Sequence, residues 1–216
     1  VEAVAAICKR NNIALHSDLT QALGKTEIDV KKMGIDYASC SAHKIYGPKG
    51  IGAAFMKSDA YGIAPITAFM HGGEQEFGFR AGTHAVHNIV GFGKAAEIAL
   101  RDLKENEAHI KSLDDMLIAG ISAIDGIHTT VDAAKRLPGI VSLVVDKSDF
   151  HNERFIKKIS EVIALSTGSA CSAGEPSYVI QALGLANEVT KVLRVSINKY
   201  TTEDDINSFL SLLKTI

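Results

Sequence analysis

The first part of the chain alternates short apolar runs with helical and glycine-bearing polar segments, and this alternation is the strongest constraint on its fold. The pattern predicts strands at Ile13–His16, Tyr37–Cys40 and Ile51–Met56, with helical segments at Val1–Asn12 and Val30–Met33. Helices and strands that alternate in sequence pack as layers around a sheet. We therefore expect an α/β fold whose sheet is largely parallel.

The rest of the chain follows a different pattern. Residues 58–83 show no clear period, and a helical pattern then runs from His84 to about Ile124, long enough for one bent helix or two helices. Strands and helices with short connections follow: strands at Ile140–Val145, Ile163–Ser166 and Val192–Asn198, and helices at Asn152–Ile159, Ser177–Leu183 and Glu203–Ile216. We expect an α/β domain over residues 1–92, and a long linking helix with a smaller α+β domain over residues 93–216.

Composition excludes several classes of function. The 23 basic and 25 acidic residues give a net charge of −2, which offers no electrostatic reason to expect a nucleic acid or a membrane surface as a partner. No apolar run approaches the roughly 20 residues of a membrane span. The three cysteines (Cys8, Cys40 and Cys171) are odd in number and widely spaced, which favours a reducing compartment over a disulfide framework. Without a signal-peptide pattern, we expect a cytoplasmic protein.

The beginning of the chain is unusual. Residue 1 is Val rather than Met, and no capping residue precedes the first helical pattern. We expect a fragment, a processed chain, or one half of a larger protein.

Polar side chains follow two of the predicted strands. Asp18 comes directly after the first, where a carboxylate of an α/β sheet points into the ligand crevice, although it would equally cap the next turn. Ser41, His43 and Lys44 follow the second. A desolvated lysine there would act as a neutral amine, and the serine and histidine are donors that suit a phosphate. Taken alone, Lys44 would more often be a solvated surface lysine.

Three further stretches carry candidate residues. The segment His71–Thr83 is dense in glycine. Glycine lets the backbone approach a ligand or a second subunit closely, but this composition is equally typical of a plain surface loop. Cys171 lies among small residues in a loop, where a thiol is either a nucleophile that must move or inert. Cys8 and Cys40 have the apolar neighbours of buried structural cysteines. Arg194 sits within a predicted strand, where its guanidinium either binds a carboxylate or faces solvent.

These motifs together resemble the cysteine desulfurases, which are pyridoxal-phosphate enzymes of the class-V aminotransferase family. The resemblance spans residues 14–200 and rests on five motifs in the family's order: Ser-Ala-His-Lys-Ile-Tyr-Gly-Pro-Lys-Gly-Ile-Gly, His-Gly-Gly, Arg-Ala-Gly-Thr, Ser-Thr-Gly-Ser-Ala-Cys, and Glu-Pro-Ser. It implies pyridoxal-phosphate-dependent fold type I, with residues 1–92 as the C-terminal part of the large domain. Relatives carry an N-terminal half that these residues do not match.

The resemblance also implies a role for each candidate residue. Lys44 binds pyridoxal 5'-phosphate covalently, Asp18 pairs with its ring nitrogen, and Gln21 binds its phenolic oxygen. Ser41 and His43 bind its phosphate, and His43 also belongs to the catalytic set. Three more residues complete the implied site: Thr83 reaches the cofactor of the second subunit of a homodimer, Arg194 binds the carboxylate of L-cysteine, and Cys171 takes the sulfur as a persulfide. Alanine is released, and the sulfur passes to an acceptor or an iron–sulfur scaffold protein.

Departures from the family pattern and rival interpretations remain. Leu19 stands beside Asp18 where relatives usually have Ala, and would crowd the cofactor ring. A non-catalytic, desulfurase-derived fragment or scaffold that binds a sulfur acceptor is the main alternative. A simple thiol enzyme with a Cys–His pair leaves Asp18, Gln21 and Lys44 unexplained. His84 and His87 lack a third ligand at a metal spacing, so we expect no metal site.

Overall fold

The computed structural model describes residues 1–62, 64–132, 136–167 and 178–216. The chain forms two compact units, Val1–Lys104 and Glu105–Ile216. The boundary expected near residue 93 falls inside α3 (Val86–Arg101), which belongs to the first unit. In the described parts of the chain, none of the helices is both long and apolar enough to cross a membrane.

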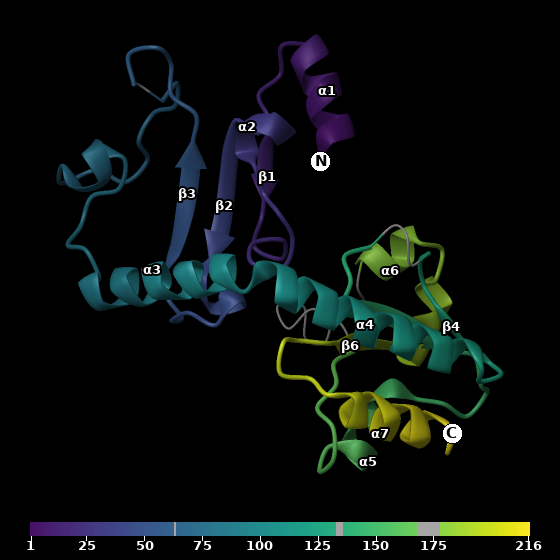
Figure 1. Ribbon diagram of the computed structural model, residues 1–216. Helices are drawn as coiled ribbons and strands as arrows, with labels where there is room; N and C mark the ends of the chain where they lie inside the picture. Colours follow the sequence, from purple (N-terminus) through teal and green to yellow (C-terminus); the bar gives the residue numbers. More distant parts are fainter. Residues whose placement is uncertain (63, 133–135, 168–177) are drawn as a thin grey trace. The chain divides into compact units, whose positions relative to one another are not determined.

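The first unit is built on a three-stranded sheet in the order β1–β2–β3 (Figure 1). The strands are β1 (His16–Asp18), β2 (Tyr37–Ser41) and β3 (Gly52–Met56). β1 and β2 are parallel, whereas β3 runs antiparallel to β2. The expectation of a largely parallel sheet is therefore wrong for β3. Residues 42–51 are too few for a crossover back to a parallel strand, which takes about a dozen residues or more.

The first unit has several short helical elements and one long helix. They are α1 (Glu2–Arg10), α2 (Val30–Met33) and the 3₁₀ turns η1 (Ala42–Ile45) and η2 (Gln75–Gly78), with α3 as the long helix of the unit. One small cluster forms the core beside the sheet, where Leu19, Ile35 and Ala38 are buried. Leu19 is only 8% exposed, so its side chain belongs to this core.

The second unit contains an antiparallel sheet in the order β4–β5–β6. Its elements are α4 (Leu103–Ser122), β4 (Ile127–Thr129), β5 (Ile140–Val145), α5 (Asn152–Ile159), α6 (Tyr178–Ala182), the 3₁₀ turn η5 (Ala186–Lys191), β6 (Val192–Ser196) and α7 (Glu203–Leu213). The long helical pattern of the sequence is thus two helices, α3 and α4, on either side of Asp102. Of the strand expected at Ile163–Ser166, only an isolated bridge between Ser166 and Arg194 is present.

A large apolar core holds the second unit together. Side chains from α4, β5, β6 and α7 make up most of it, and Leu117, Val141, Leu193 and Leu213 are fully buried. α4 and α7 pack closely, because a Cβ at Gly120 would overlap the side chain of Leu210. Such dense packing resists changes of even one methylene group.

A buried ion pair joins α4 to the segment before β5. The Arg136 guanidinium donates two hydrogen bonds to the Asp114 carboxylate, at 2.6 and 2.8 Å, and the Gly139 N–H donates a third at 2.8 Å. Both side chains are almost fully buried. Removing one partner of such a pair typically costs about 3–5 kcal/mol, so the pair secures the start of β5.

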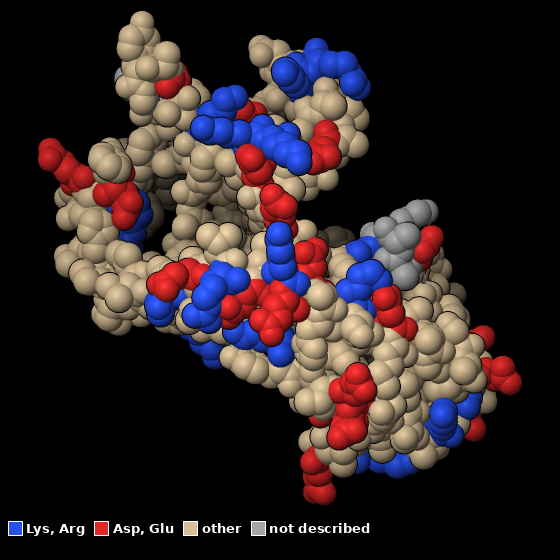
Figure 2. Space-filling model, viewed as in Figure 1, with Lys and Arg blue, Asp and Glu red and all other residues tan. Residues whose placement is uncertain are grey.

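Charged side chains on the outer helices are mixed in sign. Figure 2 shows basic and acidic groups interspersed along α3 and along α4. Pairs such as Lys94–Glu97 and Lys111–Asp115 account for part of this pattern. Exposed pairs of this kind contribute little to stability and mainly keep the helix surfaces hydrated.

Candidate active site

The carboxyl ends of β1 and β2 bring the first set of candidate residues to one edge of the sheet (Figure 1). The two strands are parallel, and Asp18, the last residue of β1, is in register with Ser39 of β2. Ser41 ends β2, and His43 and Lys44 follow within η1. In α/β sheets this edge is where ligands bind, so the topology supports a common site.

The turn after β1 holds the Asp18 carboxylate. Its Oδ1 accepts a hydrogen bond from the Thr20 N–H at 2.8 Å. The Thr20 hydroxyl has the largest effect in lowering the pKa of Asp18, and the Thr20 N–H lowers it further, because both groups stabilise the charged form. The side chain is exposed. Asp18 therefore both caps the turn and presents a charged carboxylate at the sheet edge.

The η1 turn presents His43 and Lys44 outward. Ala42 and Ile45, at the two ends of the turn, are 0% and 4% exposed, whereas the side chains between them are exposed. Tyr46 adopts a left-handed conformation with φ of 66°, and the Gly47 N–H closes the turn on the Ala42 carbonyl at 2.9 Å. The buried ends thus fix the position of a turn whose polar residues face away from the core.

Two glycines allow the backbone to approach closely around this turn. A Cβ at Gly47 would lie 3.0 Å from the Ala42 carbonyl oxygen and 3.1 Å from Ala95 on α3. A Cβ at Gly52 would overlap the carbonyl oxygen of Cys40, next to Ser41. The glycines of this motif therefore serve the packing of η1, β2 and β3.

Gln21 is engaged by a residue that the sequence motifs did not single out. The Lys25 ammonium group donates to Gln21 Oε1 at 3.0 Å. Burial lowers the pKa of Lys25, and the charge of Lys44 lowers it further. The signal that could have found Lys25 is its spacing of four residues from Gln21, since side chains at that spacing meet within a helical turn.

The donors at this edge fit pyridoxal phosphate. The half-buried Lys25 binds a neutral amide rather than a carboxylate, and it lies in the field of Lys44. A phosphate group near Lys44 would offset the positive charge of that lysine. Asp18 offers a carboxylate for a protonated ring nitrogen, and Ser41 and His43 offer phosphate donors. The residues present therefore match the charge and the hydrogen-bonding groups of this cofactor.

Thr83 lies apart from that edge in the sequence, in the segment before α3. Thr83 is exposed, and the residues around it form contacts with one another. The Gly82 N–H donates to Gln75 Oε1 at 3.0 Å, and His84 Nε2 lies 3.0 Å from Glu76 Oε1. His84 thus has a carboxylate partner in this segment.

Arg194 lies in the second unit, in the middle of β6. Its backbone is held on both sides, by Ser142 of β5 and by Ser166. Its side chain is half-buried, and Nε is a buried donor without a hydrogen-bond partner in the described part of the chain. Because an unmet buried donor of a cation is costly, Arg194 is suited to bind a carboxylate.

Of the three cysteines, only Cys8 and Cys40 fall within the described residues. Both are half-buried free thiols, so the expectation that they are buried is only partly met. Cys40 Sγ lies 3.7 Å from the Ala53 carbonyl oxygen across the β2–β3 ladder. Cys171 lies outside the described residues.

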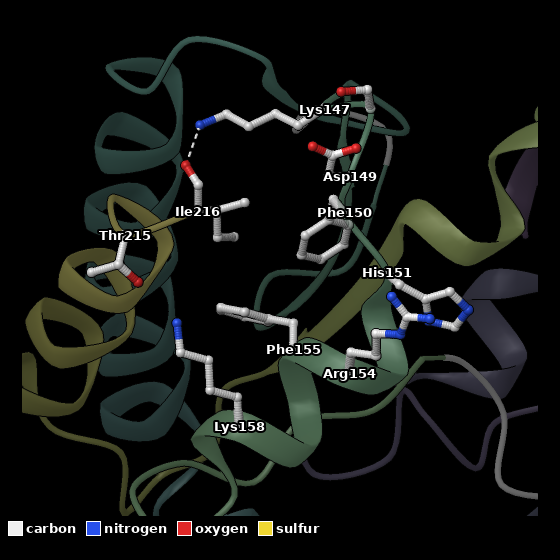
Figure 3. A pocket seen from close by; sticks show the side chains of 10 residues that line it. Lys147, Asp149, Phe150, His151, Arg154, Phe155, Lys158, Thr215 and Ile216 are labelled. Atoms are coloured by element: carbon white, nitrogen blue, oxygen red, sulfur yellow. Dashed lines mark hydrogen bonds between the residues drawn. The ribbon is translucent and has the colours of Figure 1, made fainter.

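A separate pocket occurs in the second unit, beside the start of α5 (Figure 3). In Figure 3, Lys147 reaches the Ile216 carbonyl oxygen, a hydrogen bond of 2.6 Å. The pocket is lined by ten residues, none of which is a candidate site residue: Lys147, Ser148, Asp149, Phe150, His151, Arg154, Phe155, Lys158, Thr215 and Ile216. The pocket is therefore distinct from the sheet-edge site.

Comparisons with known proteins identify the family of the chain. The family model described as aminotransferase class-V matches residues 1–209. The chain is 39% identical to a protein named cysteine desulfurase IscS from Ruthia magnifica subsp. Calyptogena magnifica, over 100% of this chain and 53% of that protein. It is 38% identical to the IscS of Aeromonas salmonicida, over 99% of this chain and 52% of that protein. The chain thus spans about half the length of the curated relatives it matches.

Solved structures show the same fold. A NifS-like protein from Rickettsia africae matches with a TM-score of 0.86 and 28% identity, covering 99% of this chain and 56% of that one. An apo cysteine desulfurase from Thermococcus onnurineus matches with a TM-score of 0.81 at 20% identity, over 100% of this chain and 55% of that one. At that identity, the second match bears on the fold alone.

Proposed function

Since the chain belongs to the aminotransferase class-V family, we propose that the protein is a pyridoxal-phosphate-dependent cysteine desulfurase. It converts L-cysteine to L-alanine and holds the sulfur on Cys171 as a persulfide. The observation that carries the proposal is the shared sheet edge, where Asp18 ends β1 and Lys44 follows β2, its parallel neighbour. The fold expected from the motifs, fold type I, is confirmed by the likeness to NifS-like structures.

Four residues at the sheet edge would hold the cofactor. Lys44 would bind it covalently through Nζ, and the ionised Asp18 carboxylate would keep its ring nitrogen protonated. Ser41 and His43 would donate hydrogen bonds to its phosphate. When bound, pyridoxal phosphate supplies a ring that withdraws electrons from the substrate α-carbon. Leu19 does not oppose this arrangement, because its side chain packs against Ile35 and Ala38 in the core.

Two further residues would act on the substrate. The Arg194 guanidinium would bind the carboxylate of L-cysteine and so orient the amino acid. The Cys171 thiolate would accept the sulfur: a bond forms between the two sulfur atoms, and the carbon–sulfur bond of the substrate breaks. The carbon takes up a proton and becomes the methyl group of alanine, so one thiol and cysteine give one persulfide and alanine.

The proposal extends to a homodimer in the cytoplasm that passes sulfur to an acceptor or an iron–sulfur scaffold protein. Support for a second copy comes from the segment that carries Thr83. Phe69 and Phe77, in the residues before it, are 93% and 98% exposed. Exposed aromatic groups that gather in one segment are typical of interfaces. Thr83 of one copy would then donate to the cofactor phosphate of the other.

The first test locates the cofactor on the complete protein. Reduction with borohydride followed by peptide mass spectrometry is expected to place a pyridoxyl group on Lys44. Lys44→Ala should lose the adduct together with the visible absorbance. An adduct on a different lysine would contradict the assignment of Lys44.

The second test concerns the nucleophile. Cys171→Ser should abolish sulfide release from cysteine while the visible absorbance of the bound cofactor remains. Cys8→Ser and Cys40→Ser are matched controls that should leave turnover largely unchanged. Persulfide labelling should map to the peptide that contains Cys171. Sulfide release at the parent rate by Cys171→Ser would sink the mechanism.

A non-catalytic scaffold that binds a sulfur acceptor is the alternative. A complete protein that binds the acceptor but carries no pyridoxyl adduct after reduction would support this alternative instead.

A further inference from the structure

We propose that Lys25 is a positioning residue of the candidate site. Its ammonium group holds the side-chain amide of Gln21, and the amide NH₂ group is thereby left to donate to the ring oxygen of the bound cofactor. The inference rests on the proposed function, because pyridoxal phosphate supplies that oxygen. Lys25 acts through Gln21 and is not required to touch the cofactor.

The chemistry of the hydrogen bond determines which way the amide faces. Lys25 Nζ lies 3.0 Å from Gln21 Oε1. A charged lysine only donates, while an amide has one oxygen that accepts and one NH₂ group that donates. The atom nearest the ammonium must therefore be the oxygen, although the two ends of an amide have nearly the same shape. The NH₂ group faces another direction and can only donate hydrogen bonds, so its partner must be an acceptor.

The turn after β1 holds Lys25 in this position. Lys25 N–H bonds to the Ala22 carbonyl at 3.0 Å within a helical turn that starts at the buried Leu19. Gly24, with φ of +71°, packs against η1: a Cβ there would lie 2.8 Å from Ile45 Cγ2. The chain therefore brings Lys25 directly beside the turn that carries Lys44.

The charge of Lys25 strengthens the donor that it positions. Lys25 is half-buried, and its partner is a neutral amide. When a cation donates to the amide oxygen, electron density shifts away from the NH₂ group, which becomes a better donor. A phenolic oxygen that carries negative charge is the acceptor that gains most from such a donor.

The test measures cofactor affinity in the complete protein. Lys25→Met is expected to weaken pyridoxal phosphate binding about tenfold, the effect of one charge-assisted hydrogen bond, whereas Lys25→Arg retains a cationic donor and most of the affinity. An analogue of the cofactor without the 3-hydroxyl group should bind Lys25→Met and the parent protein equally. In a Gln21→Ala background, Lys25→Met should cause no further loss. Lys32→Met removes an exposed lysine of α2 and serves as the control.

A second measurement needs no cofactor. The side-chain amide resonances of Gln21 in NMR spectra should shift in Lys25→Met and stay near the parent position in Lys25→Arg. Unchanged resonances in Lys25→Met, or a tenfold loss that persists in Gln21→Ala, would overturn the inference. Failure of the parent protein to bind pyridoxal phosphate would instead overturn the proposed function, and the amide resonances would still report on the Lys25–Gln21 contact.

Discussion

At the scale of single residues, Asp18 shows that a turn cap and a functional carboxylate are compatible. The hydrogen bond from Thr20 uses Oδ1 and fixes the side chain at the end of β1. The same interactions lower the pKa of Asp18, so the carboxylate stays charged in mildly acidic solution. A local turn thus prepares the charge that a protonated ring nitrogen requires.

Thr20→Val should raise the pKa of Asp18 toward its ordinary value, because it removes the hydroxyl group that lowers it most. A carboxylate with a lowered folded-state pKa stabilises the fold above its unfolded pKa, and this contribution is lost as the pH falls through the folded pKa. In Thr20→Val the loss should begin at a higher pH. An NMR titration of the Asp18 carboxyl carbon measures the shift. Asp29, whose pKa is lowered by backbone donors at the start of α2, should titrate as before.

Residue types at the sheet edge could be read from the sequence, but their orientations could not. Asp18, Ser41, His43 and Lys44 follow predicted strands, and the structure places them at adjacent strand ends. The spacing of Lys25 from Gln21 is local, but the position of Lys25 beside the η1 turn depends on packing, because Gly24 contacts Ile45, which is distant in sequence. A contact between residues so far apart cannot be predicted from the spacing of residues in the sequence.

At the scale of elements, the β2–β3 hairpin supports the η1 turn. Gly52 faces Ser41 across the ladder, and a side chain there would overlap the Cys40 carbonyl oxygen. The close approach of the two strands is therefore a condition for the position of Ser41.

Gly52→Ala should lower the free energy of unfolding by about 1–3 kcal/mol, the usual cost of forcing a group into occupied space. The matched control is Gly93→Ala on α3, where a Cβ would meet nothing within 4 Å. There alanine should stabilise the helix by up to about 1 kcal/mol. Urea unfolding of both variants measures the difference. Equal stability of the two variants would show that the hairpin tolerates a side chain at residue 52.

Element types were more predictable than strand directions and ends. The sequence predicts the first strand at Ile13–His16, but the strand is His16–Asp18. The Leu15 N–H donates to the Asp36 carboxylate, and the Leu15 carbonyl accepts from the Asp36 and Tyr37 N–H groups, ahead of the ladder. β4 was not expected, since three residues are too few for a periodic signal. The direction of β3 depends on the length of a connection rather than on its apolar pattern.

At the scale of the whole molecule, the two units differ in how much apolar surface they bury. The second unit has an extensive core of side chains from its sheet and helices, whereas the first has a small cluster around Leu19, Ile35 and Ala38. Four of the five residues of β3 are exposed. The motifs indicated two parts of the chain, but only the structure shows this contrast, since core size depends on which apolar faces find partners.

Hydrogen exchange should reveal the contrast directly. The amides of β5, the central strand of the second unit, are expected to exchange more slowly than those of β2, the central strand of the first. Opening of β5 requires disruption of the larger core, and exchange follows the free energy of local opening. Mass spectrometry of peptides from both strands measures the rates. Equal protection would mean that core size does not govern local stability here.

The exposed strand β3 also bears on how copies of this chain behave at high concentration. In the described residues β3 pairs only with β2, so its outer edge offers unpaired backbone groups beside exposed apolar side chains. A net charge of −2 provides little mutual repulsion between molecules. Charge repulsion would therefore oppose association through this edge only weakly, and added salt, which screens charge, would change such association little.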